Sequence, residues 1–277
     1  FGIDNDIKKV NSLKKGLLYI KNHNLKNFNY FKKYKNQVSN NYNVLKSCDV
    51  ILICLPTPLK NLKPDMSFIY NCVSKIKKIL RPYQILILES TVYPGATEQL
   101  VKLIKNNKLE IGKNFFVGYS PERENPGDKN FSYKSTPKVV SGFTKNCEMF
   151  VKNIYSPIVR KIVVAKKVKD AELSKLLENM YRAVNIGLVN ELKVICEKLK
   201  IDIFNVIELA STKNFGFQKF LPGPGLGGHC IPIDPYYLSW ISKKNGYDPL
   251  ILKSSAKINK NMPKFITNKI LRFFNKK

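Results

Sequence analysis

A cysteine and an aspartate stand four residues apart in the segment His229-Cys230-Ile231-Pro232-Ile233-Asp234. A thiolate attacks carbonyl carbons readily, and a nearby carboxylate can move the protons that such a reaction needs. The neighbouring prolines favour a rigid loop. The alternative is a buried structural cysteine, which is the usual situation of a free thiol. Taken alone, Cys230 fits both interpretations.

The glycine-rich run Gly223-Pro224-Gly225-Leu226-Gly227-Gly228 comes directly before this segment. A phosphate-binding turn would follow a strand and open a helix, whereas here no strand pattern precedes the run, and Pro232 and Pro235 prevent an immediate helix. Glycines still allow a ligand to approach the backbone closely. We therefore expect a substrate loop at this point and not a dinucleotide turn.

Three polar segments directly follow apolar runs: Leu55-Pro56-Thr57-Pro58, Glu89-Ser90-Thr91-Val92 and Ser120-Pro121-Glu122-Arg123. Ligands of open α/β sheets bind at the carboxyl ends of the strands. Thr57, Thr91 and Glu122 are therefore candidates for contact with a cofactor or substrate. The alternative for each threonine is a helix cap or a turn residue.

Lys175 and Asn179 lie four residues apart in a segment whose apolar residues recur with the helical period from 170 to 199. That pattern predicts one long helix, on which the two residues share a face. The alternative for the pair is a solvated surface contact. A second helix is expected over 203–210.

The first half of the chain alternates short apolar runs with helical patterns. The runs lie at 50–55, 85–88, 115–117, 139–140 and 162–164, and the helical patterns at 66–80, 97–106 and 147–155. This alternation favours buried parallel strands in an α/β sheet.

Phe1 to Asp4 has the pattern of a strand end, and an acidic residue at that place binds a ribose in dinucleotide-binding folds. The glycine-rich turn of such a fold would lie about twenty residues upstream, before Phe1.

Composition limits the possible functions. The net charge of +28 comes from 48 basic and 20 acidic residues, but the lysines are scattered and only five residues are arginine. No nucleic-acid-binding motif accompanies them, so we expect attraction of a small anionic ligand and not of a nucleic acid. No apolar stretch is long enough to span a membrane, no leader is visible, and the six cysteines have no metal-ligand or disulfide pattern. We expect a cytoplasmic protein without a bound metal.

Taken together and in order, the segments resemble one family. They are Asp4, Leu-Pro-Thr-Pro at 55–58, Glu-Ser-Thr-Val at 89–92, Ser-Pro-Glu-Arg-Glu-Asn-Pro-Gly at 120–127, Lys175 with Asn179, and Gly-Leu-Gly-Gly-His-Cys-Ile-Pro-Ile-Asp-Pro at 225–235. The series is similar to the nucleotide-sugar 6-dehydrogenases of the UDP-glucose/GDP-mannose dehydrogenase family over essentially the whole chain. It looks most like the UDP-N-acetylglucosamine enzymes, with the UDP-N-acetylgalactosamine and UDP-N-acetylmannosamine enzymes as near neighbours.

The resemblance implies an α/β fold with a Rossmann-like parallel sheet, without its first strand, followed by an all-helical central domain. The implied domains are 1–164 for NAD binding, 165–262 for dimerisation and catalysis, and 263–277 as the start of a UDP-binding domain. A homodimer through the helix at 170–199 is implied as well. Because the family's glycine-rich turn and third domain lie outside these 277 residues, we expect the residues alone to be nearly inactive.

The resemblance also implies the chemistry. Family members oxidise the C6 hydroxyl of a sugar to a carboxylate with two NAD+ per turnover, for O-antigen or capsule synthesis. Cys230 would attack the aldehyde to form a thiohemiacetal, which loses hydride to give a thioester that water hydrolyses. Lys175 and Asn179 would stabilise the oxyanion, and Asp234 would manage water and protons with Thr91 and Glu122.

Binding residues follow from the same resemblance. Asp4, Lys9, Thr57 and Thr91 would contact NAD. The UDP-sugar would be held by Glu122, Arg123, Lys175, Asn179, Phe220, Leu221, Pro222, Gly223, Gly225, Gly227 and Gly228. The alternative function is a non-catalytic remnant that only dimerises or binds a partner.

Overall fold

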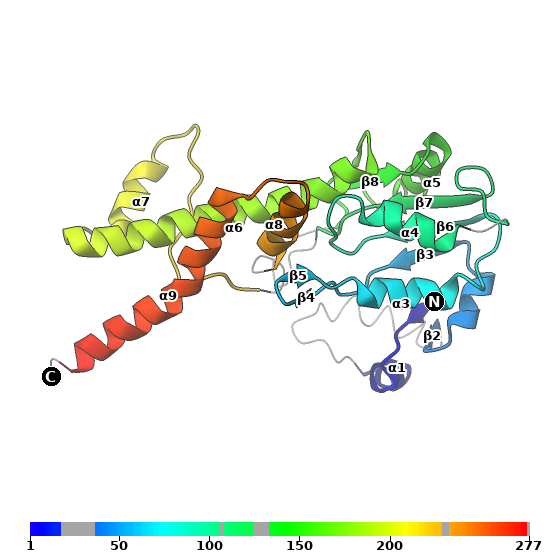
Figure 1. The fold of residues 1–277 in the computed structure, drawn as a ribbon, viewed down its shortest axis with the longest axis horizontal. Helices are drawn as coiled ribbons and strands as arrows, with labels where there is room; N and C mark the ends of the chain where they lie inside the picture. The colour runs from blue at the N-terminus through cyan, green and yellow to red at the C-terminus, as the bar shows by residue number, and fades with distance from the viewer. Residues whose placement is uncertain (18–36, 106–107, 124–132, 229–232, 276–277) are drawn as a thin grey trace. The chain divides into compact units, whose positions relative to one another are not determined.

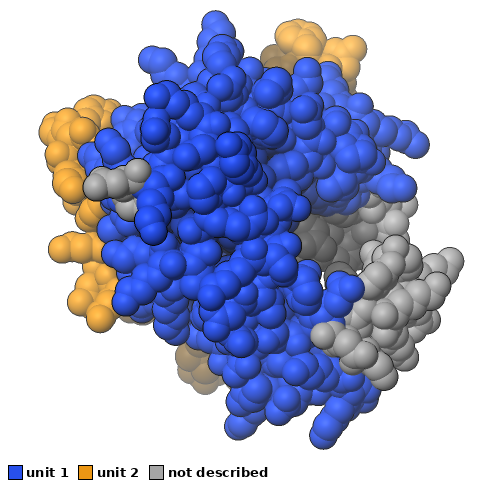
Figure 2. All heavy atoms as spheres, turned by 90° about the vertical axis from the view of Figure 1, so that its right-hand side faces the viewer, with its two compact units in different colours: residues 1–57, 66–172 blue, residues 58–65, 173–277 orange. Residues whose placement is uncertain are grey.

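The computed structural model describes residues 1–17, 37–105, 108–123, 133–228 and 233–275 (Figure 1). The chain divides into two compact units, which Figure 2 colours separately. Unit 1 contains residues 1–57 and 66–172, and unit 2 contains residues 58–65 and 173–277. Among the described residues, no helix combines the length and the apolar character that a membrane span requires.

Unit 1 is built on a five-stranded sheet with the strand order β3-β6-β7-β8-β9. These strands are β3 (Val50–Ile53), β6 (Gln84–Leu88), β7 (Phe115–Tyr119), β8 (Lys138–Gly142) and β9 (Ile162–Val164). A separate parallel pair joins β1 (Gly2–Ile3) to β2 (Val38–Ser39), and the short helix η2 (Tyr42–Ser47) follows β2. The α/β class with a Rossmann-like sheet, as expected from the sequence, is confirmed.

Helices alternate with these strands. In unit 1 they are α1 (Ile7–Lys14), α3 (Ser67–Ile76), α4 (Ala96–Ile104) and α5 (Lys145–Tyr155). The long helix α6 (Val168–Leu199) begins in unit 1 and continues into unit 2. Unit 2 also holds the antiparallel pair β4 (Leu59–Lys60) and β5 (Lys63–Pro64), with α7 (Ile203–Ser211), α8 (Asp234–Lys244) and α9 (Leu250–Phe274). Helix α9 runs through residue 263, and the start of a further domain at 263–277 stays a prediction.

One strand pair corrects the sequence-based expectation of parallel strands. Strands β3, β6 and β7 run parallel, and so do β8 and β9, but β8 runs antiparallel to β7 through Gly118–Gly142 and Tyr119–Ser141. The apolar runs correctly indicated buried strands. They do not indicate strand direction, because a strand can be buried equally well in either direction. The start of β8 consequently lies at the same edge of the sheet as the end of β7.

The core of unit 1 forms where α5 covers one face of the sheet. Ile85, Ile87, Phe116 and Val140 of the strands pack there with apolar residues of α5. All five residues of β6 are buried, as expected for a strand with neighbours on both sides and helices on both faces. This packing of the strands against α5 fixes the positions at which the strands end.

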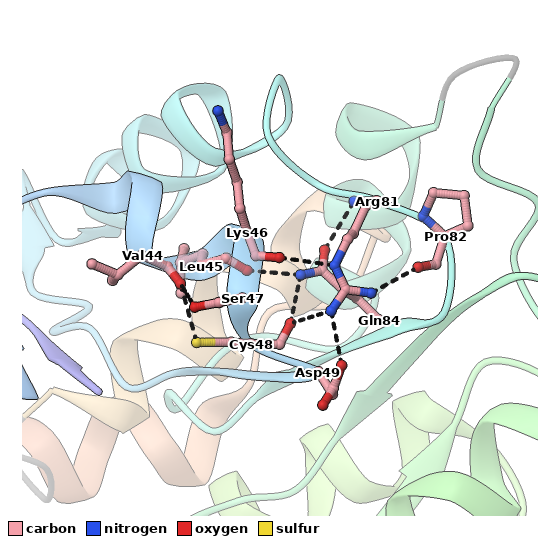
Figure 3. A network of polar contacts seen from close by, with 9 residues as sticks. All are labelled: Val44, Leu45, Lys46, Ser47, Cys48, Asp49, Arg81, Pro82 and Gln84. Atoms are coloured by element: carbon pink, nitrogen blue, oxygen red, sulfur yellow. Dashed lines mark hydrogen bonds and ion pairs between the residues drawn. The ribbon is translucent and has the colours of Figure 1, made fainter.

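A polar network fixes the starts of β3 and β6, at the edge of the sheet away from their carboxyl ends (Figure 3). The Gln84 side chain is fully buried, and its Nε2 donates to the carbonyls of Leu45 at 2.8 Å and Cys48 at 2.6 Å. The Arg81 guanidinium donates to the Lys46 carbonyl at 2.9 Å and to Asp49 Oδ1 at 2.8 Å. These bonds connect η2 to the start of β6 and hold β3 and β6 in place. The polar residues that follow these two strands are therefore attached to strands of fixed position.

The start of α4 is held by a carboxylate from α6. Glu172 is 0% exposed, and it accepts from the backbone N–H of Gly95 at 2.6 Å, the backbone N–H of Thr97 at 2.8 Å and the Thr97 hydroxyl at 2.7 Å. Gly95 has φ +96°, a left-handed conformation that favours glycine. Glu172 therefore satisfies N–H groups that a helix start otherwise leaves without a partner.

Replacement of Glu172 by alanine is expected to lower the free energy of unfolding by about 3 kcal/mol, because buried donors lose their acceptor. Urea unfolding measures the change. The control is Glu98→Ala on α4, because Glu98 forms only a partly exposed ion pair with Lys169 at 3.0 Å. Equal losses in the two variants would show that the buried carboxylate has no special role.

Candidate active site

Unit 2 brings together two of the residues that the sequence singled out. The Asn179 side-chain amide on α6 donates a hydrogen bond to Asp234 Oδ2 at the start of α8. Both side chains are buried, and Asp234 is only 2% exposed. The helical period places Asn179 on α6, and Pro235 favours a helix that begins at Asp234. Two segments far apart in sequence therefore meet at a buried polar contact.

The environment of Asp234 suits proton transfer. Burial raises the pKa of the Asp234 carboxyl to about 6, while the hydrogen bond from Asn179 and the positive charge of Lys175 act in the opposite direction. Lys175 lies one helical turn before Asn179, so its ammonium can act on the same carboxyl. A carboxyl with a pKa near neutrality can both accept and release a proton at physiological pH.

The glycine-rich loop is anchored at one end by buried amides. The Gly223 N–H donates to Asn190 Oδ1 at 2.8 Å, and Asn190 Nδ2 donates to Asn259 Oδ1 at 2.8 Å. Gly225 has φ +118°, and a Cβ there would lie 2.9 Å from the Asn259 carbonyl oxygen. Phe220 packs against a buried cluster of α6 and α7. The backbone at 220–225 is therefore fixed against α6 and α9.

At the other end of the loop, a Cβ at Gly227 or Gly228 would meet no atom of the described residues within 4 Å. Leu221 is exposed as well. Pro222 is half-buried beside Gly223. Glycines at the end of an anchored loop would let a ligand approach the backbone closely, and the substrate loop stays a prediction.

In unit 1, the loops that follow β3 and β6 are joined. The Thr57 hydroxyl donates to the Thr91 carbonyl oxygen at 2.8 Å. Asp4 follows β1, accepts from the Asp6 N–H at 2.8 Å and lies 3.7 Å from Lys9 Nζ. The Asp4 side chain is one-third exposed and can still accept from a ribose hydroxyl, so these residues fit the adenosine part of a dinucleotide.

Glu122 belongs to a second polar cluster of unit 1. Lys138 Nζ lies 3.1 Å from Glu122 Oε2 and 2.9 Å from Glu89 Oε1. The Arg123 N–H donates to Glu122 Oε1 at 2.9 Å, and Arg123 Nη1 donates to the Pro137 carbonyl at 3.0 Å. The Ser-Pro-Glu-Arg segment is thereby tied to the start of β8.

The structure therefore assembles the predicted residues in two groups. Thr91 and Glu122 belong to unit 1, and Lys175, Asn179 and Asp234 belong to unit 2. Cys230 lies outside the described residues. The meeting of all six at one cleft stays a prediction.

Sequence reasoning did not assign roles to Lys138, Glu89, Asn190 or Asn259. One signal could have found Asn190. It continues the spacing of the buried residues Leu176, Met180, Ala183 and Gly187 on α6, so an amide at this position had to be buried and bonded.

Comparison with known protein families decides the identity of the fold. Residues 1–159 match the NAD binding domain of the UDP-glucose/GDP-mannose dehydrogenase family, and residues 169–261 match its central domain. The chain belongs to this family.

The chain is similar to several curated members of the UDP-glucose/GDP-mannose dehydrogenase family. Protein CapL of Staphylococcus aureus is 42% identical to it over 85% of the chain and 56% of CapL. The UDP-N-acetyl-D-glucosamine 6-dehydrogenase of Pseudomonas aeruginosa is 39% identical over 82% of the chain and 54% of that protein. The structure of a UDP-D-ManNAc dehydrogenase from Pyrococcus horikoshii matches 99% of the chain and 66% of its own, with a TM-score of 0.90 at 27% identity. The chain spans about half the length of the curated relatives it matches.

Proposed function

We propose that these residues form the NAD-binding and central parts of an enzyme that oxidises the C6 hydroxyl of a UDP-N-acetylhexosamine to a carboxylate. The observation that carries the proposal is the buried Asn179–Asp234 contact on the segment that follows Cys230, in a chain that matches both family domains. UDP-N-acetylglucosamine is the proposed substrate, because a relative of that specificity is 39% identical. We propose a role in the synthesis of surface polysaccharide, carried out in the cytoplasm, where thiols stay reduced.

Bound NAD+ supplies an acceptor for the hydride that leaves C6 in each of the two oxidations. We assign the adenosine ribose to Asp4, the neighbouring part of the cofactor to Lys9, and the lining of its site to Thr57 and Thr91. The position of these residues after strands β1, β3 and β6 supports this assignment, since the ligands of parallel sheets lie at that edge.

The other steps, which are thiol addition, oxyanion stabilisation and thioester hydrolysis, are assigned to side chains of this chain. Cys230 attacks the aldehyde carbon, and a thiohemiacetal forms between its sulfur and C6. The Lys175 ammonium and the Asn179 amide stabilise the oxyanion. After the second oxidation has left a thioester, water attacks the carbonyl carbon, Asp234 accepts the proton of that water, and the Cys230 thiolate leaves.

The sugar nucleotide is assigned to the glycine-rich loop. Residues 220–228 would surround the UDP-sugar, with the anchored part at 220–225 fixing the open part at Gly227 and Gly228. We also assign Glu122 and Arg123 to the sugar, and Thr91 with Glu122 to the attacking water.

Calorimetric titration with NAD+ and with UDP-N-acetylglucosamine tests the proposal on the full reading frame that contains these residues. We expect both ligands to bind, and UDP-N-acetylmannosamine to bind more weakly than UDP-N-acetylglucosamine. A protein that binds neither ligand but still dimerises would be the non-catalytic remnant and would contradict the proposal.

We also propose that the enzyme is a homodimer through α6. An apolar stripe on this helix is uncovered among the described residues, and Leu188 within it is 52% exposed. The stripe comprises Leu173, Leu177, Tyr181, Leu188, Leu192, Ile195 and Leu199. A stripe of this length costs free energy in water, so a second copy of the helix is its natural partner.

Light scattering after size-exclusion chromatography is expected to give the mass of a dimer for the parent protein and of a monomer for Leu188→Glu, because a buried charge disrupts an apolar interface. The control is Arg182→Glu, which changes charge outside the stripe. A monomeric parent at micromolar concentration would contradict the dimer.

A further inference from the structure

One buried cation lies between two carboxylates at the edge of the sheet where the candidate site residues of unit 1 are found. The Lys138 side chain is only 3% exposed, and its ammonium contacts Glu89 Oε1 at 2.9 Å and Glu122 Oε2 at 3.1 Å. Burial of an unpaired ammonium would be very costly, so both carboxylates stabilise it. The question is what this arrangement does for Glu122, the one member of the trio with a proposed contact to substrate.

The direction of β8 explains why Lys138 is there. Lys138 is the first residue of β8, which runs antiparallel to β7. Its start therefore lies at the carboxyl edge of β6 and β7, next to the residues that follow those two strands. Glu89 follows β6, and Glu122 lies three residues after β7. A β8 parallel to β7 would place Lys138 at the opposite edge.

Glu89 accepts from three donors. Besides Lys138, the Tyr155 hydroxyl donates to Glu89 Oε1 at 2.6 Å and the Cys54 thiol donates to Glu89 Oε2 at 3.3 Å. Burial, together with the charge of Glu89, raises the pKa of the Cys54 thiol to about 12 and raises that of the Tyr155 hydroxyl as well. Both groups keep their protons at physiological pH and donate them to Glu89, which lies beside Lys138 as its counter-ion.

Glu122 is different. Its side chain is 37% exposed, and it accepts from the Arg123 N–H and Lys138 Nζ. Burial works against the charge of Lys138, but Glu89 and Glu122 outweigh it, so the pKa of Lys138 lies above its usual value. The ammonium is thus a permanent charge, held from behind by Glu89, with Glu122 on its solvent-accessible side. The rings of Tyr133 and Tyr155 lie 5.4 Å and 5.0 Å from it and leave it little room to move.

We propose that Lys138 is a positioning residue, which orients the Glu122 carboxylate for its contact with substrate through an ammonium anchored on Glu89. This inference rests on the proposed function, in which Glu122 holds the attacking water. Without the ammonium, Glu89 and Glu122 are left with the uncharged groups of Cys54, Tyr133 and Tyr155. The adjacent Arg123 guanidinium donates to the Pro137 carbonyl at 3.0 Å, and no ion pair between it and Glu122 is seen among the described residues. Glu122 then takes up a proton more easily and loses the contact that orients it.

The test compares Lys138→Met with Lys138→Arg and with the double variant Lys138→Met/Glu89→Gln, which removes one carboxylate together with the cation. Lys145→Met is the control, because Lys145 pairs with Glu148 on an exposed surface. Carbon-13 NMR of labelled glutamate follows the titration of Glu122 without any need for activity. Steady-state rates of UDP-N-acetylglucosamine oxidation give the pH profile of kcat.

In Lys138→Met we expect the Glu122 titration to move up by about one pH unit or more, the acidic limb of the kcat profile to move with it, and kcat to fall about tenfold or more. Lys138→Arg should titrate close to the parent, and the double variant should shift less than Lys138→Met, because one of the two neighbouring carboxylates is gone. If Lys138→Met does not fold, the double variant decides, since it also lacks the cation and its Glu122 titration should still lie above that of the parent.

An unshifted Glu122 in folded Lys138→Met, or an unshifted Glu122 in the double variant, would overturn the inference. The NMR readout separates this outcome from failure of the proposed function. A shifted Glu122 in a protein that oxidises no UDP-sugar leaves the positioning role intact and removes the function, whereas oxidation with an unshifted Glu122 does the reverse.

Discussion

Substitution of Cys230 by serine is expected to lower the formation of the uronate product by about a thousandfold or more. A serine hydroxyl remains protonated at neutral pH and is a much weaker nucleophile than a thiolate, so the covalent intermediate of the second oxidation does not form. Mass spectrometry of the sugar nucleotides measures the uronate directly, and the same spectra show whether the aldehyde or its hydrate accumulates.

The matched control is Cys48→Ser. The Cys48 thiol donates to the Val44 carbonyl at 3.4 Å, a bond that a serine hydroxyl can also make, and Cys48 lies next to the start of β3, away from the carboxyl ends of the strands. Uronate formation by this variant should equal that of the parent. A Cys230→Ser enzyme that forms uronate at the parental rate would contradict covalent catalysis by this residue.

Substitution of Asp234 by asparagine is expected to separate stability from activity. Loss of a group that transfers protons lowers kcat by about 10² to 10⁴-fold. The pKa of Asp234 is raised from its ordinary value of 3.8 to about 6 by burial, so the folded state favours the protonated carboxyl. The stabilising contribution of this group is complete below about pH 4, is lost as the pH rises through about 6, and is absent above that.

At about pH 8, the free energy of unfolding of Asp234→Asn should therefore exceed that of the parent by up to about 3 kcal/mol, because the neutral amide avoids the cost of a buried charge. Urea unfolding measures this difference. Asparagine can still accept from Asn179. The control is Asp248→Asn, since Asp248 is exposed and pairs with Lys253 at 2.6 Å. A variant that loses activity and stability together would give Asp234 a structural role instead.

The elements of the fold could be predicted from the sequence because burial leaves a periodic pattern. The long helix expected over 170–199 is α6 at Val168–Leu199, and the run at 85–88 is β6 at Gln84–Leu88. The direction of β8 could not be predicted in this way. An apolar run such as Val139-Val140 records that a strand is buried and contains no information on which way it runs.

The candidate site was predictable to the extent that its residues stand in distinctive segments. Asn179 and Asp234 were named in advance and share a buried hydrogen bond. Lys138 was not named. The chain has many scattered lysines, and a lysine directly before an apolar run usually faces solvent, so nothing in the sequence indicated that this one is buried. Its burial depends on Glu89 and Glu122, which lie 49 and 16 residues away in sequence. Partners at such separations become visible only in the folded chain.

The stoichiometry of the reaction tests the central claim most directly. The NADH released is measured by absorbance against the UDP-N-acetylglucosamine consumed, with NAD+ in excess and the full reading frame that contains these residues. Oxidation of an alcohol to a carboxylate at one enzyme predicts two NADH for each sugar nucleotide, with no free aldehyde. One NADH for each sugar nucleotide, or none, would contradict the account.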